Sequence, residues 1–159
     1  MTNELMQACT ARITQASKTE MVVIVYEIIL SDIEAAQTAY QNGDTMVFIK
    51  ELKHAQRFLS ELMGTLDYKY KISFDLMSLY IYVNKALITA VLQKDPETLT
   101  TADSVLRKLM VGFRGICKED LSGPVMQNTQ QLYAGLTYGK GILNEVSLDP
   151  REQNRGYKA

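Results

Sequence analysis

The stretch LMSLYIYVNKALITAVLQKD, residues 76–95, decides the fold class because its apolar residues recur at helical spacing. Residues three and four apart lie on one face of an α-helix, and that face here carries Leu76, Leu79, Tyr80, Val83, Leu87 and Ala90. The helix should stop before Pro96, since the proline ring disfavours helical geometry at the preceding residue. The sequence therefore predicts an amphipathic helix that buries one of its faces.

A long helix is also predicted near the N-terminus, where Ser17 and Glu20 have the spacing of a capping box. Apolar residues then recur at helical spacing as far as Ile29, and the turn-forming run 42–44 ends the helix. The run 22–25 is β-branched and favours a strand by local propensity, but the helical pattern continues well past the length of an ordinary strand. We therefore expect a helix here.

Two further helices are predicted downstream. The first spans Thr45 to Met63, is closed by Gly64, and carries on one face Phe48, Leu52, Ala55, Leu59 and Leu62. The second begins at Pro96, which the first turn tolerates, and carries Leu99, Ala102, Val105, Leu106, Leu109, Met110 and Phe113. Residues 3–15 add a short leading helix. Because short connections make neighbouring helices antiparallel, we expect an all-α fold, an antiparallel up-and-down four-helix bundle.

The last part of the chain has a different composition. Residues 120–159 hold five of the nine glycines and two of the three prolines. We therefore expect a bundle domain at residues 1–119, including the leading helix, and a glycine-containing C-terminal tail at residues 120–159. Helix-breaking glycines in the tail alternate with apolar residues, namely Leu132, Tyr133, Leu136 and Tyr138. Two states of the tail stay open: disordered, or strapped onto a groove of the bundle.

The charge and hydropathy patterns argue against nucleic acid and membrane partners. Seventeen Lys and Arg against eighteen Asp and Glu leave a net charge of −1, so there is no basic excess to neutralise phosphates or anionic lipids. The apolar run 21–25 is too short to span a bilayer, and the N-terminus lacks the apolar core of a signal peptide. We expect a cytoplasmic protein without membrane insertion, in which Cys9 and Cys117 are reduced structural thiols.

One motif is compatible with metal chemistry. Glu51 and His54 form a Glu-x-x-His pair, a spacing that di-iron helical bundles use twice, but His54 is the only histidine in the chain. The sequence contains no glycine-rich phosphate loop and no nucleophile elbow, and no base is available to either cysteine. We therefore expect no enzyme activity, no metal and no cofactor, and we expect Glu51 and His54 to lie on a solvated, salt-bridging face.

Two segments resemble the flagellin export chaperone family FliS. Residues 17–27 are similar to the opening pattern of that family at Ser17, Glu20 and Tyr26. Residues 76–82, followed by Leu87, Ala90 and Lys94-Asp95, are similar to its LxxLYxY…LxxA…KD run, and Leu66-Asp67 is similar to the LD loop that precedes this run. The similarity covers about residues 13–119. The family pattern is not kept at Lys18, at Asn84-Lys85 or at Phe113, which is typical of a divergent member.

The resemblance implies a cytosolic chaperone that binds the C-terminal segment of flagellin and keeps it monomeric and secretion-competent. In that family the segment folds into helical pieces within apolar grooves between the helices. Other flagellar proteins are further expected partners. The residues expected to line the grooves are Val22, Tyr26, Ile29, Leu76, Leu79, Tyr80, Tyr82, Val83 and Leu87. The alternative function is a generic helical protein-interaction module with a different cargo.

Overall fold

Four long helices make up most of residues 10–126, the part of the chain that the computed structural model describes. They are α2 (Lys18–Gln41), α3 (Thr45–Gly64), α4 (Ile72–Gln93) and α5 (Leu99–Cys117). All four belong to one compact unit, Met1–Val125. Residues 10–13 are also helical, and residues 10–126 contain no strand. The prediction of an all-α fold is confirmed. The predicted leading helix ends two residues early, because residues 14–15 form a turn. Residues 3–9 of that prediction and residues 127–159 of the predicted tail lie outside the described residues.

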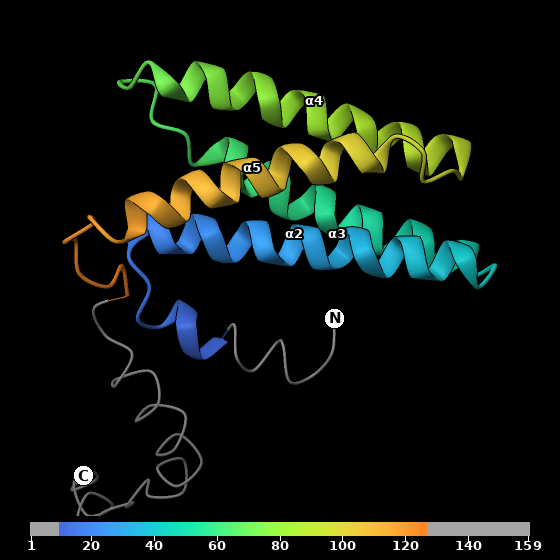
Figure 1. Cartoon of the computed structure of the whole chain (residues 1–159), viewed down its shortest axis with the longest axis horizontal. Helices are drawn as coiled ribbons and strands as arrows, with labels where there is room; N and C mark the ends of the chain where they lie inside the picture. Colours follow the sequence, from blue (N-terminus) through green and yellow to red (C-terminus); the bar gives the residue numbers. More distant parts are fainter. Residues whose placement is uncertain (1–9, 127–159) are drawn as a thin grey trace, which may run out of the picture. The chain divides into compact units, whose positions relative to one another are not determined.

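Successive helices run in opposite directions, and each lies beside two others (Figure 1). α2 contacts α3 and α5, and α4 contacts the same two helices from the other side. The connections are short and span residues 42–44, 65–71 and 94–98. Each helix can therefore bury one face in a common core while part of its opposite face stays at the surface.

The core consists of the apolar residues that recur at helical spacing. All five residues predicted to form one face of α3 are buried, with Phe48, Leu52, Ala55 and Leu59 at 0% exposure and Leu62 at 5%. Burying one such large apolar side chain contributes about 1.5–3 kcal/mol. A second, smaller cluster joins Ala16 to Ile24 and Ile28, so residues just before α2 also pack against it.

Side-chain caps set the start of two helices. The hydroxyl of Ser17 accepts a hydrogen bond from the Glu20 backbone N–H at 3.2 Å, which confirms the predicted start of α2. At the start of α3, Asp44 accepts from the Val47 backbone N–H at 3.0 Å. The β-branched run 22–25 lies within α2, as the helical pattern predicted.

The predicted start of α5 at Pro96 is wrong, because the helix begins at Leu99. A separate turn precedes it, in which Asp95 accepts a hydrogen bond from the Glu97 backbone N–H at 2.9 Å. The Thr98 hydroxyl also donates to the carbonyl oxygen of Ala86 on α4 at 2.9 Å. These contacts hold residues 95–98 in a turn that is tied to the preceding helix.

Candidate functional site

Most of the residues predicted to line a partner groove lie in the core. The exposed fraction is at most 7% for Tyr26, Ile29, Leu76, Tyr80, Val83 and Leu87. Val22 is half-buried, while Leu79 and Tyr82 are exposed at 37% and 46%. Of the nine predicted groove residues, Val22, Leu79 and Tyr82 are therefore the three available to a partner without a change in the packing of the helices.

The two buried tyrosines of the predicted groove form a hydrogen-bonded pair between α2 and α4. The hydroxyl oxygens of Tyr26 and Tyr80 lie 2.5 Å apart. The ring of Phe113 on α5 meets that of Tyr26 edge-on, with ring centroids 5.7 Å apart. Burial, together with the neighbouring Tyr80, raises the pKa of Tyr26 well above its usual range, and burial also raises the pKa of Tyr80. Both hydroxyls therefore stay neutral and join α2 to α4 within the core, while the ring of Tyr26 adds the contact with α5.

We expect Tyr80→Phe to lower the free energy of unfolding by about 1–3 kcal/mol, because it leaves the buried hydroxyl of Tyr26 without its partner. The double variant Tyr26→Phe with Tyr80→Phe should recover most of this loss, since neither hydroxyl then remains. Urea unfolding of the wild type, both single variants and the double variant measures the difference. A double variant that loses the sum of the two single effects would contradict a coupled pair.

α4 exposes apolar side chains on the side opposite its buried residues. Phe74, Ile81 and Ile88 are spaced by seven, Leu92 follows four positions later, and their exposed fractions are 58%, 41%, 41% and 76%. These four residues are here called the outer face of α4. Phe74, Ile81 and Ile88 each lie two positions before a buried residue, namely Leu76, Val83 and Ala90, and Leu92 lies about one turn after Ile88. Two positions correspond to about half a turn, so all four lie on the side of the helix away from the core. Exposed apolar surface of this kind is typical of protein-binding sites.

The composition of α4 carries the same signal. Among the described helices, α4 is long and apolar enough to cross a membrane by length and composition, with a mean hydropathy of 1.3, although part of it is buried inside the protein. The polar residues Ser78, Asn84 and Lys85 interrupt its apolar residues, so α4 contains no long uninterrupted apolar run. α4 thus carries more apolar surface than its packing against α3 and α5 covers.

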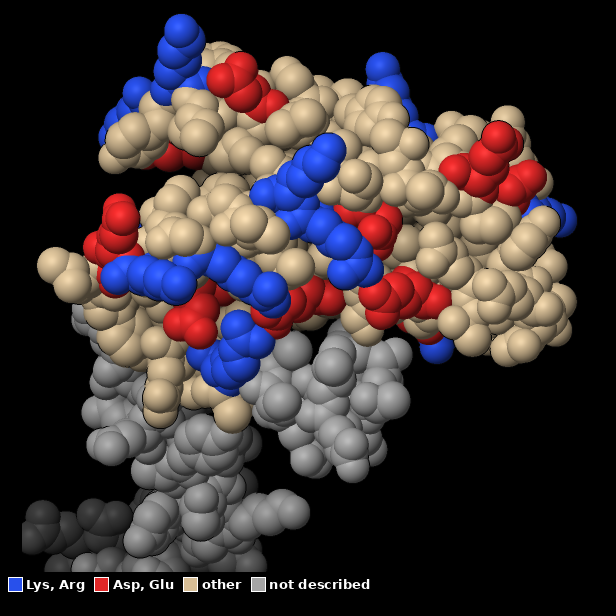
Figure 2. All heavy atoms as spheres, viewed as in Figure 1, with Lys and Arg blue, Asp and Glu red and all other residues tan. Residues whose placement is uncertain are grey.

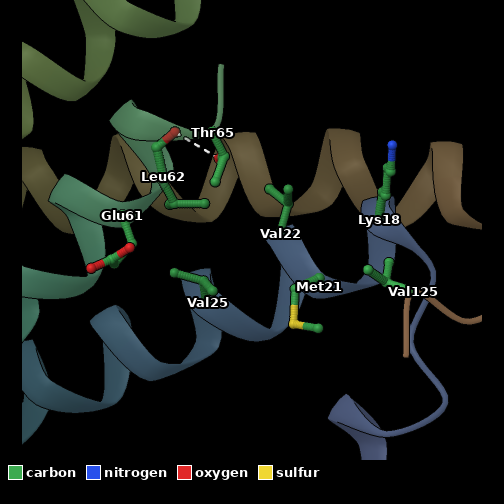
Figure 3. A pocket seen from close by; sticks show the side chains of 8 residues that line it. All are labelled: Lys18, Met21, Val22, Val25, Glu61, Leu62, Thr65 and Val125. Carbon is green, nitrogen blue, oxygen red and sulfur yellow. Dashed lines mark hydrogen bonds between the residues drawn. The ribbon is translucent and has the colours of Figure 1, made fainter. Parts of the chain in front are cut away.

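A cleft of about 450 Å³ lies between the N-terminal half of α2 and the C-terminal end of α3 (Figure 3). Its lining residues are Lys18, Met21, Val22, Val25, Glu61, Leu62, Thr65 and Val125. The backbone N–H of Val125 donates to the carbonyl oxygen of Ala16 at 3.0 Å, which fixes residue 125 beside the start of α2. Sequence reasoning identified Val22 but missed the other lining residues, because the cleft forms only where two helix ends meet.

The predicted surface residues do not all meet in this cleft. Val22 lines it, whereas Leu79 and Tyr82 do not. The latter two belong to α4, which does not lie side by side with α2 and meets it through core side chains such as the Tyr26–Tyr80 pair. The candidate site therefore has two parts, the cleft on α2 and α3 and the exposed apolar surface of α4.

Charged side chains on α2 and α5 pair with one another, and Figure 2 shows basic and acidic atoms side by side over these helices. Arg12 and Arg114 contact Glu27 at 2.6 and 2.8 Å, and Arg107 contacts Glu34 at 2.6 Å. Burial raises the pKa of Glu27, but hydrogen bonds from the two arginines outweigh it and hold this pKa below its ordinary value. The basic groups named here are therefore engaged with carboxylates.

The expectation of a solvated face at Glu51 and His54 needs correction. Both residues are half-buried, and Nδ1 of His54 lies 2.7 Å from Oδ2 of Asp32, a fully buried residue of α2. Burial raises the pKa of Asp32, and the hydrogen bond with His54 opposes this effect. The pair Glu51 and His54 thus lies at the border between the core and solvent, next to a buried carboxylate.

A helical chain with an apolar cleft and an exposed apolar helix face has the features of a protein that binds another polypeptide. The family model of the flagellar protein FliS matches residues 1–120, and the chain therefore belongs to the FliS family. The match confirms the resemblance carried by residues 17–27 and 76–95, and membership implies the role of a flagellar export chaperone. FliS is a family of chaperones rather than enzymes, in agreement with the expected absence of catalysis. No curated protein gives a significant match.

Proposed function

We propose that this protein is a cytoplasmic export chaperone that binds the C-terminal segment of flagellin and keeps it monomeric and competent for secretion. The observation that carries the proposal is the apolar surface that the packed helices leave uncovered, in the cleft beside Val22 and on α4 around Leu79 and Tyr82. Membership in the FliS family gives the class of cargo. In this proposal the binding domain is an antiparallel up-and-down four-helix bundle within residues 1–119, and residues 120–159 are its C-terminal tail.

The proposed binding couples the folding of the segment to its association. Ordering a disordered segment costs about 2–5 kcal/mol or more of the gross interaction energy, and burial of apolar area, at about 25 cal/mol per Å², offsets this cost. Tyr82 is well suited to such a contact, because its ring buries apolar area while its hydroxyl can stay in water or bond to the backbone of the partner. Its exposure of 46% leaves much of the ring available.

The positions of the two surfaces favour an extended partner over a compact one. Val22 lies on α2 and Tyr82 on α4, and each of these helices has α3 and α5 as its neighbours, while core side chains such as Tyr26 and Tyr80 join the two from within. A segment that contacts both residues has to pass around α3 or α5. A chain that is disordered when free can do this, since it folds on the surface of its partner. Tyr26, Tyr80 and Leu87 lie in the core and do not take part in this contact unless the helices repack.

Titration of the full chain with a synthetic flagellin C-terminal peptide tests the proposal. We expect saturable binding with a negative heat-capacity change, which is typical of apolar burial, and a gain of helical circular dichroism as the peptide folds. A scrambled peptide of the same composition is the matched control. Equal binding of both peptides would favour the generic interaction module, and the absence of binding to the native peptide would contradict the proposed cargo.

A further inference from the structure

Among the described residues, one carboxylate oxygen buried between α2 and α3 has no hydrogen-bond partner. The side chain of Asp32 is fully buried, and its Oδ2 contacts Nδ1 of His54 at 2.7 Å. The other oxygen, Oδ1, is buried as well and has no hydrogen-bond partner among the described residues. A buried carboxylate oxygen of this kind is costly unless it binds a hydrogen-bond donor or a cation.

A second carboxylate completes a cluster around this atom. Glu51 precedes His54 by three residues on α3, so both side chains leave the same face of the helix. One ligand atom from each of Asp32, Glu51 and His54 can be chosen such that all three lie within 4.8 Å of one another. Asp32 is buried, whereas the side chain of His54 is 40% exposed, so the cluster has a buried end and a side that solvent can reach.

We propose that Asp32, Glu51 and His54 bind a divalent transition-metal ion of the zinc type. Two carboxylates and one imidazole are common zinc ligands, and water takes the fourth position where a site is open to solvent. The ion would give Oδ1 of Asp32 the partner that it lacks and would balance the charge of the two carboxylates.

The geometry requires only a small adjustment of side chains. Two ligand atoms that bind one tetrahedral zinc ion at about 2.0–2.1 Å lie roughly 3.3 Å apart. Oδ2 of Asp32 and Nδ1 of His54 lie 2.7 Å apart, too close for both to bind the ion, so a ring nitrogen of His54 has to move to roughly 3.3 Å from Oδ1. Rotation of the half-exposed His54 ring can supply this, while the buried Asp32 stays in place.

The proposed ion connects α2 to α3 at a place separate from the candidate peptide-binding surfaces. None of the three ligands lines the cleft at Val22 or belongs to the outer face of α4. Because the ligands come together only when the two helices pack, the ion would bind the folded state and stabilise it. The metal site and the peptide-binding activity can therefore be tested independently.

Calorimetric titration of the full, untagged chain with zinc chloride tests the site. The parent protein for this experiment is the variant Cys9→Ser with Cys117→Ser, because cysteine thiolates bind zinc as well. We expect one equivalent of zinc to bind and the midpoint of thermal unfolding to rise with zinc concentration. Asp32→Asn and His54→Gln should each weaken zinc binding at least about tenfold, since even residues that only orient metal ligands change affinity by 10–100-fold.

The matched control is Asp75→Asn, which removes an exposed carboxylate of α4 away from the cluster. It should leave zinc affinity unchanged. Asp32→Asn keeps the size of the side chain and a hydrogen-bonding partner for His54, so its circular dichroism should match that of the wild type, and Glu51→Gln at a half-buried position gives a second folded variant. The absence of zinc binding to the parent protein, or equal affinity of these folded variants and the parent, would overturn the proposal.

Discussion

Leu87→Ala is expected to lower the free energy of unfolding by about 2–5 kcal/mol, because it removes a large apolar side chain from the core and leaves a cavity. Leu87 has an exposed fraction of 0% and lies on the face of α4 that meets α3 and α5. The same substitution at Leu92, which is 76% exposed on the same helix, should change stability by less than about 0.5 kcal/mol. Urea unfolding followed by circular dichroism measures both.

Leu92→Ala is a close control, since it makes the same chemical change in the same helix and alanine is an equally good helix former. The pair separates burial from helix propensity. A large loss of stability in both variants would mean that the outer face of α4 is covered in solution. That result would contradict the exposure of this face in the free protein.

The helices were predictable from sequence because their signals are local. The cap at Ser17 and the apolar spacing from Phe48 to Leu62 each lie within one helix or at its end, and the structure confirms them. The start of α5 was not predictable in this way. The bond from Thr98 to Ala86 joins residues twelve positions apart, and no pattern within residues 95–98 reveals it.

The candidate site was less predictable than the fold, because an apolar residue at helical spacing looks the same in a core and in a groove. α4 carries apolar residues on several sides, so its pattern alone did not show that Tyr80 faces the core while Tyr82 faces solvent. The spacing of seven between Phe74, Ile81 and Ile88 is a readable sequence signal of a second apolar face on this helix. The contact of Asp32 with His54 joins two helices and required the tertiary structure.

Tyr82→Ala is expected to weaken binding of the flagellin C-terminal peptide by about thirtyfold or more, which corresponds to about 2 kcal/mol, as for an aromatic residue at the centre of an interface. The free energy of unfolding should change by less than about 1 kcal/mol, because Tyr82 is 46% exposed and outside the core cluster. Calorimetric titration and urea unfolding of the same protein preparation measure the two effects separately.

Tyr40→Ala is the matched control, since Tyr40 is 45% exposed but lies at the C-terminal end of α2, away from the cleft that Val22 lines. It removes the same side chain at nearly the same exposure, so a general effect of losing a surface tyrosine appears equally in both variants. Selective loss of affinity in Tyr82→Ala supports a partner contact on α4. Equal affinities of the two variants would place the partner elsewhere, and a loss of folding in Tyr82→Ala would show that this ring belongs to the core, as the ring of Tyr80 does.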